Sequence, residues 1–523
     1  MGAVMQTRSS LIQEYLERIL KARVYDVARE TPLSPAPRLG KRLDAKVWLK
    51  REDLQPVFSF KLRGAYNRMR LLTSEELARG VICSSAGNHA QGVALSAKYL
   101  GCRARIVMPR TTPAIKVDAV RALGGEVVLS GDSYDEAQTE ARRLEQEQHL
   151  VYVHPYDDPE VIAGQGTIAM EIMRQHDEQI DAIFIPVGGG GLMAGIGSYI
   201  KALYPEIRIV GVEPADAASM TASLAAGSRV VLEEVGLFAD GVAVKHVGAQ
   251  TFAICQEVVD EMITVDTDAI CAAIKDVYED TRTILEPAGA LATAGLKVWR
   301  RQHPEGHPTL IALACGANMN FDRLRHVAER AELGEEREAL LAVTIPEAPG
   351  SFRTFCRSLG ARAITEFNYR YADTDCAHVF AGVQVKDRAE AEQLAADLRS
   401  HGYETLDLTG NEMAKLHLRH VVGGRAQPVG APAGNHDGMN GGERLFRFVF
   451  PERPGALARF LDSLPDRCNI TLFHYRNHGA DVGRVFAGMQ IPAGLETQFE
   501  AFLQELGYEY IEESDNPAAR LFL

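Results

Sequence analysis

Lys61 is the residue of this chain whose neighbours most favour nucleophilic chemistry. It lies in the segment SFKLRGA, residues 59–65, beside Phe58 and Phe60 and with no acidic residue within three positions. A deprotonated lysine amine attacks a carbonyl carbon to form an imine, and apolar burial lowers its pKa toward that form. A surface lysine before a helix is the more frequent case for a single motif of this kind. The neighbouring motifs therefore decide the interpretation.

A second motif, SSAGNHAQG at residues 84–92, follows a predicted strand and opens an apolar helix. Backbone N–H groups and hydroxyls at a helix N-terminus suit an anion such as a substrate carboxylate, and the amide of Asn88 can donate a hydrogen bond to a ring oxygen. An ordinary capped helix is the simpler alternative. The candidate substrate-binding residues are Ser84, Ser85, Ala86, Gly87, Asn88 and His89.

Four consecutive glycines, Gly188 to Gly191, separate a predicted strand from a predicted helix over 193–203. Backbone that wraps closely around a phosphate at a helix start explains such a run. A dinucleotide fingerprint is the rival interpretation, because Gly189, Gly191 and Ala194 keep its spacing and Glu213 ends the next strand. Taken alone, this segment fits a nicotinamide oxidoreductase nearly as well as a phosphate site.

The elements that must position these motifs alternate between strands and helices from about residue 45 to 330. This alternation is typical of parallel sheets built from β-α-β units, so an α/β fold is predicted. The strand candidates are residues 47–49, 80–83, 104–108, 126–129, 183–186, 209–212 and 310–313.

An internal repeat follows residue 329. LAVTIPEAPG at 341–350 is echoed by FRFVFPERPG at 446–455, and VFAG at 379–382 recurs at 485–488. Each copy predicts a strand, a Pro-Gly loop, a helix, two strands and a helix, consistent with a small ferredoxin-like α+β sandwich. Between the copies, residues 423–442 are rich in Gly, Pro, Ala and Asn and are predicted to be a linker.

Composition excludes several classes of protein. The 523 residues are 46% hydrophobic and 24% charged, as in a globular protein of several domains. A net charge of -14 without a basic run argues against nucleic acid. The uncharged stretch 182–200 contains Pro186 and six glycines, so no membrane helix is predicted. Eight cysteines without a C-x-x-C pair and no signal peptide indicate a reducing, cytoplasmic location.

The three motifs, in this order and at these separations, resemble the biosynthetic-type threonine dehydratases (threonine ammonia-lyases). These are pyridoxal-phosphate enzymes of the tryptophan synthase β fold type. The resemblance spans essentially the whole chain, and the duplicated unit is similar to the paired ACT-like regulatory domains of the long members. Further segments that carry it are TPL at 31–33, KRED at 50–53, EPAGA at 286–290 and CGAN at 315–318.

This resemblance implies a domain plan. It predicts a two-lobed catalytic domain with parallel-type sheets over residues 1–332 and a first regulatory domain over 333–422. The linker, residues 423–442, is then followed by a second ferredoxin-like regulatory domain over 443–523.

The resemblance also implies roles for single residues. Lys61 is implied as the imine-forming lysine and proton carrier, Phe60 as a ring-stacking neighbour, and Asn88 as the partner of the cofactor's phenolic oxygen. Cys315 matches the position that faces the pyridine nitrogen, where long biosynthetic members usually have Ser and several shorter relatives have Cys. A neutral partner there makes the ring a weaker electron sink. The residues implied in phosphate binding are Gly188, Gly189, Gly190, Gly191 and Leu192.

Related serine racemases and dehydratases bind a cation near the segment that matches residues 211–214. Ser219 stands where the later acidic ligand is expected, so no metal site is predicted. Glu213 is interpreted instead as a strand-end acid on a solvated face.

The reaction implied is the dehydration and deamination of L-threonine to 2-oxobutanoate and ammonia, the committed step toward isoleucine. Feedback inhibition by isoleucine, relieved by valine, and a homotetramer are the family expectations. Tyr369 and Tyr475 are equivalent between the repeats and each is followed by Arg, which makes them the candidate effector-binding residues. Aromatic core packing explains both tyrosines equally well.

Three alternatives stay open. A serine dehydratase or serine racemase of the same fold differs by recognition of one methyl group, worth roughly 1 to 3 kcal/mol. A nicotinamide oxidoreductase leaves Lys61 and Asn88 without a purpose. A non-catalytic amino-acid sensor explains the repeats alone.

Overall fold

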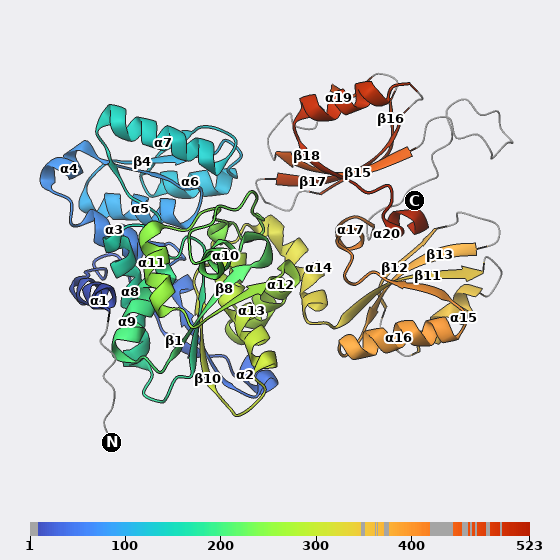
Figure 1. Ribbon diagram of the computed structural model, residues 1–523, viewed down its shortest axis with the longest axis horizontal. Coiled ribbons are helices and arrows are strands. Elements are labelled where there is room, and N and C mark those ends of the chain that lie inside the picture. Colours follow the sequence, from blue (N-terminus) through green and yellow to red (C-terminus); the bar gives the residue numbers. More distant parts are fainter. Residues whose placement is uncertain are drawn as a thin grey trace. The chain divides into compact units, whose positions relative to one another are not determined.

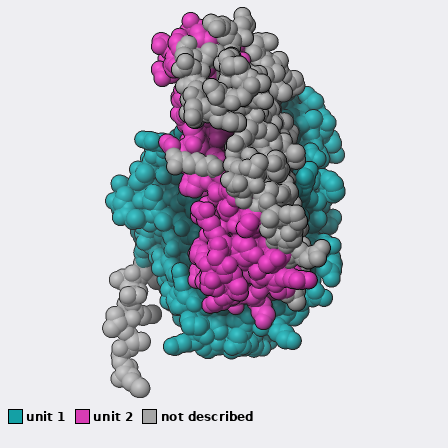
Figure 2. Space-filling model, turned by 90° about the vertical axis from the view of Figure 1, so that its right-hand side faces the viewer, with its two compact units in different colours: residues 1–331 teal, residues 332–523 magenta. Residues whose placement is uncertain are grey.

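The computed structural model of the chain (Figure 1) divides into two compact units, residues 1–331 and 332–523, which Figure 2 colours teal and magenta. The predicted linker at 423–442 lies outside the described residues. The structure describes residues 9–346, 351–360, 362, 364–370, 376–418, 443–451, 459–460, 463–465, 468–476, 482–491 and 494–522.

The first unit contains two sheets, and the predicted α/β class is confirmed. Six strands form one sheet in the order β1-β2-β10-β7-β8-β9, in which only β1 is antiparallel to its neighbour. The second sheet has the order β5-β4-β3-β6 and is parallel throughout. The strands are β1 (Leu33–Pro35), β2 (Lys46–Arg51), β3 (Val81–Ser84), β4 (Ala104–Met108), β5 (Glu126–Leu129), β6 (Val151–Tyr152), β7 (Ala182–Pro186), β8 (Arg208–Pro214), β9 (Glu261–Val265) and β10 (Thr309–Ala314).

Helices alternate with these strands, and several begin at residues that satisfy the free N–H groups of a first turn. Ser133 and Glu136 form a capping box at the start of α7, and Asp158 caps α8. The helices are α1 (Ser10–Lys21), α2 (Pro37–Leu43), α3 (Lys61–Met69), α4 (Ser74–Arg79), α5 (Asn88–Leu100), α6 (Ala114–Ala122), α7 (Tyr134–Gln148), α8 (Pro159–Gln175), α9 (Gly191–Leu203), α10 (Ser219–Ala226), α11 (Ala249–Val258), α12 (Thr267–Thr281), α13 (Pro287–Gln302) and α14 (Leu324–Gly334).

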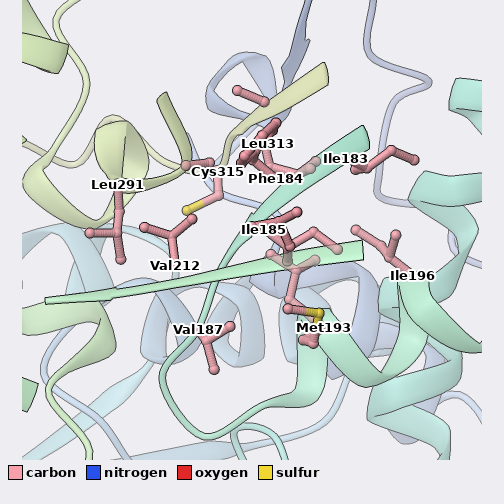
Figure 3. Close-up of a cluster of buried hydrophobic side chains, with 14 of the residues drawn as sticks. Ile183, Phe184, Ile185, Val187, Met193, Ile196, Val212, Leu291, Leu313 and Cys315 are labelled. Atoms are coloured by element: carbon pink, nitrogen blue, oxygen red, sulfur yellow. The ribbon is translucent and has the colours of Figure 1, made fainter. Parts of the chain in front are cut away.

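The largest apolar core surrounds the six-stranded sheet. Every residue of β7 and β10 is buried, as expected for parallel strands that helices cover on both faces. Figure 3 shows part of this core, in which Ile185, Val212 and Leu313 pack with residues of α9 and α13, and Cys315 is one of its members. The strand ends that carry the motifs are therefore held on a rigid scaffold.

The second unit contains two copies of one antiparallel fold. The sheet orders β12-β13-β11-β14 and β16-β17-β15-β18 are equivalent, which confirms the predicted ferredoxin-like repeat. Each copy ends in one strand more than predicted, β14 or β18. The elements are β11 (Glu338–Pro346), α15 (Ser351–Ser358), β12 (Ile364–Arg370), β13 (Cys376–Gln384), α16 (Arg388–Ser400), β14 (Glu404–Asp407), α17 (Glu412–Leu416), β15 (Glu443–Pro451), β16 (Asn469–Arg476), β17 (Val482–Gln490), α19 (Glu496–Leu506), β18 (Glu509–Glu512) and α20 (Pro517–Phe522).

Each copy has its own core, and a further apolar cluster joins residues of both, among them Leu340, Phe380, Leu445 and Phe486. In the described part of the chain, no helix combines the length and the apolar character needed to cross a membrane.

Candidate active site

Lys61 is the first residue of α3, and its side-chain amine lies in a confined environment. The Nζ atom donates to the carbonyl oxygen of Pro155 at 3.2 Å and lies 5.4 Å from the ring centroid of Phe60. Desolvation lowers the pKa of the amine to about 8, and the nearby Cys315 and Glu286 oppose this shift. Roughly one Lys61 amine in ten is therefore deprotonated, and thus nucleophilic, at pH 7, far more than at the ordinary lysine pKa of 10.5.

The segment before Lys61 pairs with the segment that follows β10. Ser59 and Gly316 form an antiparallel bridge, and the N–H of Ala317 donates to the carbonyl oxygen of Phe58 at 2.9 Å. Phe58 has a φ of 54°, a left-handed conformation that a bulky side chain adopts only where its surroundings impose it. This pairing holds the start of α3 against the carboxyl end of β10.

Asn88 begins α5, directly after the loop that follows β3, and its side-chain amide is held on both sides. Its Nδ2 donates to Oε1 of Glu286 at 2.5 Å, and Nδ2 of Asn318 donates to its Oδ1 at 2.6 Å. The amide orientation is thereby fixed, which leaves one N–H of Asn88 for a further acceptor. Because Asn88 follows β3 and Asn318 follows β10, the contact joins the carboxyl ends of the two sheets.

Glu286 and Asn318 lie in the segments EPAGA and CGAN, and the sequence assigns neither of them a role in the site. Glu286 occupies the N-cap position of α13, yet its carboxylate makes no capping hydrogen bond. Burial raises the pKa of this carboxyl to about 7, with a smaller contribution from Asp240. The group next to Asn88 therefore titrates close to neutrality.

Cys315 is buried directly after β10. Its Sγ donates to the carbonyl oxygen of Ala288 at 3.4 Å, and burial raises the pKa of the thiol far above its ordinary value. Cys315 is consequently a neutral thiol that carries no charge into the site.

The glycine loop connects β7 to α9, with Gly190 in a left-handed conformation at a φ of 93°. A side chain on Gly189 would overlap the ring of Tyr156, and a Cβ on Gly191 would lie 2.9 Å from the Tyr156 carbonyl oxygen. Gly188 and Leu192 flank this close approach. The loop is a tight cradle that ends at the N-terminus of α9, where the first-turn N–H groups suit an anion.

Two neighbouring residues connect the glycine loop to Lys61. Tyr156 packs against the loop, while the carbonyl oxygen of Pro155 accepts the hydrogen bond from the lysine amine. The loop also follows β7, which pairs in parallel with β10, so that it and Cys315 emerge at the same sheet edge. Lys61, Asn88, Cys315 and the glycine loop are thus assembled around one place.

The predicted substrate loop, residues 84–89, follows β3 and is partly exposed from Ser85 to Asn88. Ser85 accepts at its Oγ a hydrogen bond from the N–H of Gly87 at 3.3 Å, whereas the Oγ of Ser84 is buried without a partner. His89 is buried, and its Nε2 lies 2.9 Å from the carbonyl oxygen of Val153. Its pKa is lowered to about 3 by desolvation and by Lys61, so His89 is a neutral support of the loop.

The interpretation of Glu213 as an acid on a solvated face is wrong. Glu213 is fully buried at the end of β8, and its carboxylate accepts the N–H of Met220 at 2.8 Å together with the N–H and Oγ1–H of Thr221 at 2.8 and 2.7 Å. These bonds cap the first turn of α10, because that helix begins directly above the strand end. Within the described ranges, no group of three or more His, Cys, Asp or Glu side chains is placed to hold a metal ion.

Replacing Glu213 by alanine is expected to lower the free energy of unfolding by about 1–3 kcal/mol, because buried donors of α10 lose their acceptor. Burial raises the pKa of Glu213 from 4.5 to about 7, so the native chain binds this proton more tightly than the unfolded chain. The stabilisation therefore decreases as pH rises through this interval, and the loss should be larger at pH 5 than at pH 8. Urea unfolding at both pH values, with the exposed Glu233→Ala as control, measures it; equal losses would contradict the assignment.

Tyr369 and Tyr475 occupy equivalent backbone positions in the two regulatory copies. Tyr369 in β12 lies opposite Val379, and Tyr475 in β16 lies opposite Val485. Their side chains lie outside the described part of the structure, so their role as effector-binding residues stays a prediction.

Comparison with known proteins bears on both units. Residues 24–316 match the family of pyridoxal-phosphate dependent enzymes, and residues 329–418 and 437–523 match the C-terminal regulatory domain of threonine dehydratase. The chain is 58% identical over 513 residues to the biosynthetic L-threonine dehydratase IlvA of Burkholderia multivorans, covering 98% of this chain and 99% of that protein. It is 52% identical to the Escherichia coli protein of the same name, covering 98% and 97%.

Solved structures resemble the catalytic part. The processed form of threonine deaminase isoform 2 from Solanum lycopersicum is 55% identical with a TM-score of 0.61, over 62% of this chain and 94% of that one. Maize serine racemase is 33% identical with a TM-score of 0.56, over 61% and 95%. With a match that covers nearly the whole of both chains and a regulatory domain of the same kind, this chain belongs to the biosynthetic threonine dehydratases, a family of pyridoxal-phosphate dependent enzymes.

Proposed function

We propose that this chain is a threonine ammonia-lyase, which removes water from L-threonine and releases 2-oxobutanoate and ammonia. The observation that carries the proposal is the confined amine of Lys61, with a pKa lowered to about 8, beside the glycine loop and Asn88. The identity to biosynthetic dehydratases over nearly the full chain supports the same substrate.

The residues of the site fit pyridoxal 5′-phosphate. The glycine loop, which admits no side chain beside Tyr156, places backbone N–H groups at the start of α9 where they suit a phosphate, and Asn88 keeps one N–H for the phenolic oxygen. Lys61 supplies the nucleophilic amine, with Phe60 as the stacking neighbour, and Cys315 supplies a neutral partner for the ring nitrogen. Bound there, the cofactor provides an electron sink for the charge that develops at the substrate Cα.

The chain's own side chains perform the proton transfers and the orientation. Nζ of Lys61 removes the Cα proton of threonine, and the Ser84 to His89 loop holds the substrate carboxylate so that the Cα–H bond is aligned for cleavage. The neutral thiol of Cys315 does not strengthen the electron sink, which favours prompt loss of the β-hydroxyl over a long-lived carbanion. The released enamine tautomerises to the imine, which a water molecule hydrolyses to 2-oxobutanoate and ammonia without a redox step.

We further propose that the second unit senses the end product. Residues 333–422 and 443–523 form the two regulatory domains after a catalytic domain of residues 1–332, isoleucine inhibits, and valine relieves the inhibition. The match of this region to the regulatory domain of threonine dehydratase supports the proposal. Tyr369 and Tyr475 are the proposed contacts, and a cytoplasmic homotetramer is the proposed state.

Release of 2-oxo acid from threonine and from serine, each with and without isoleucine, tests these proposals. We expect threonine to be the better substrate and isoleucine to lower its turnover and raise the melting temperature. Serine is the second candidate, since maize serine racemase has the same catalytic fold and one methyl group separates the substrates. If isoleucine changed neither the kinetics nor the melting temperature, the regulatory proposal would fail.

A further inference from the structure

Four charged side chains form a buried cluster beside the helix that begins with Lys61. Lys50 of β2, Glu52 of the turn after it, Arg63 of α3 and Glu171 of α8 all have 0% relative exposure. We call these four residues the charge cluster. Its two positive and two negative charges cancel, so that no net charge is buried.

Arg63 uses every one of its donors in this cluster. Its Nε and Nη2 form a bidentate pair with Glu52, both at 2.8 Å, and its Nη1 donates to Glu171 at 2.6 Å. The remaining two N–H groups bond Oγ1 of Thr167 and the carbonyl oxygen of Arg29, both at 3.1 Å. A planar guanidinium with five satisfied donors has one permitted position, which is a stronger constraint than a single ion pair.

Lys50 completes the cluster through hydrogen bonds to elements other than α3. Its Nζ donates to Oε2 of Glu171 and the carbonyl oxygen of Thr31, both at 2.6 Å, and to Oε1 of Gln175 at 3.2 Å. Lys50 is thus equivalent to Arg63 in burial and charge but not in its connection to Lys61.

The backbone at the start of α3 lies between two helices at close range. A Cβ on Gly92 of α5 would lie 3.0 Å from the backbone nitrogen of Leu62, and a Cβ on Gly164 of α8 would lie 2.7 Å from the carbonyl oxygen of Arg63. These approaches leave the first turn of α3 no space for lateral movement, because protein interiors are close-packed. The rotation of α3 about its own axis is then set by its side chains.

The lysine amine hydrogen bond joins the start of α3 to the segment that precedes α8. Lys61 begins α3, and Pro155, whose carbonyl oxygen accepts from Nζ, lies shortly before α8. Further along, Arg68 of α3 pairs with Asp158 at the cap of α8 at 3.0 Å. Of these two ion pairs between α3 and α8, that of Arg63 with Glu171 is the closer to Lys61 along α3, two residues away.

We propose that Arg63 is a positioning residue. Its hydrogen bonds to Glu52 and Glu171 fix the position of the Lys61 amine. This inference rests on the proposed role of Lys61. A shift of about 1 Å in a catalytic group costs on the order of 100-fold in rate, so the ion pairs of Arg63, which contact no substrate, still govern turnover.

Three full-length variants test the proposal. Arg63→Lys removes the bidentate hydrogen bonds to Glu52 but keeps the positive charge, and Glu52→Gln weakens the same hydrogen bonds by removing the negative charge. Lys50→Gln is the matched control. For each we would measure the melting temperature, kcat and KM for threonine. We would also measure the rate at which the cofactor-free chain binds added pyridoxal phosphate as a function of pH. That rate requires a deprotonated Lys61, so in the native sequence it should rise with increasing pH and reach its midpoint near pH 8. Cys315, Glu286, His89 and His154 are the other titratable groups near the amine.

All three variants are expected to melt earlier, because each disturbs a buried ion pair. Only Arg63→Lys and Glu52→Gln should raise the pH midpoint, by about one unit, and lower kcat by about 10- to 100-fold with a smaller change in KM. If Arg63→Lys does not fold, the milder Glu52→Gln variant provides the test of the proposal. Midpoints and kcat values equal to those of Lys50→Gln would overturn the proposal. A native chain that neither binds pyridoxal phosphate nor releases 2-oxo acid would instead reject the proposed function.

Discussion

Replacement of Lys61 by alanine is expected to lower 2-oxobutanoate release from threonine by about 10³-fold or more. The side chain supplies both the nucleophilic amine and the group that moves the Cα proton, and its neighbour His89, with a pKa lowered to about 3, is a weak substitute base. The protein should also lose the visible absorbance of a covalently held cofactor. Steady-state kinetics and the absorbance spectrum of the purified chain measure both effects.

Lys98→Ala is the matched control, because this lysine is exposed on α5. We expect it to retain the turnover and the absorbance of the native chain, and both variants should keep the native melting temperature within a few degrees. If the Lys61 variant retained turnover in the same fold, Lys61 would not be the catalytic lysine.

The second large effect is expected for Gly189→Ala. The added methyl group would overlap the ring of Tyr156, so either the ring or the glycine loop must move. Overpacking of this kind costs about 1–3 kcal/mol, and because the loop is the proposed phosphate cradle, we expect the Kd for pyridoxal phosphate to rise by roughly 10- to 100-fold. Titration of the cofactor-free chain with pyridoxal phosphate gives this constant.

Gly410→Ala is the control for this experiment, since a Cβ at that position meets no atom within 4 Å. It should leave the Kd unchanged. The rate of 2-oxobutanoate release by the Gly189 variant should recover substantially when pyridoxal phosphate is supplied in excess. An unchanged Kd for pyridoxal phosphate in that variant would show that the glycine loop does not bind the phosphate.

Sequence patterns identified several strands whose own composition favours a strand, although β9, EMITV, was not predicted. β4 and β5 have the predicted bounds, because runs such as ARIVM and EVVL favour a strand by themselves. β6 has only two residues, and β14 and β18 read ETLD and EYIE. These segments become strands by pairing with a neighbouring strand, as β14 does with β11. Their composition does not indicate this pairing.

The candidate site was predictable where one short segment carries the chemistry. Lys61, Asn88 and the glycine run were named because each lies in a recognisable motif. The contacts of Asn88 with Glu286 and Asn318 span 198 and 230 residues of sequence, so no local pattern indicates them. Glu213 was misjudged for the same reason, since the burial of a strand-end acid depends on where the following helix begins.

The charge cluster has an electrical consequence as well as a mechanical one. The titratable groups that act on the pKa of Lys61 are Cys315 and Glu286, and no member of the cluster is among them. The cluster thus restricts the movement of α3 without being among the groups that shift the pKa of the Lys61 amine. Rigidity and acidity are therefore separate variables here: an apolar set of the same shape could replace the cluster and leave the proton affinity of Lys61 unchanged, provided that α3 kept its place.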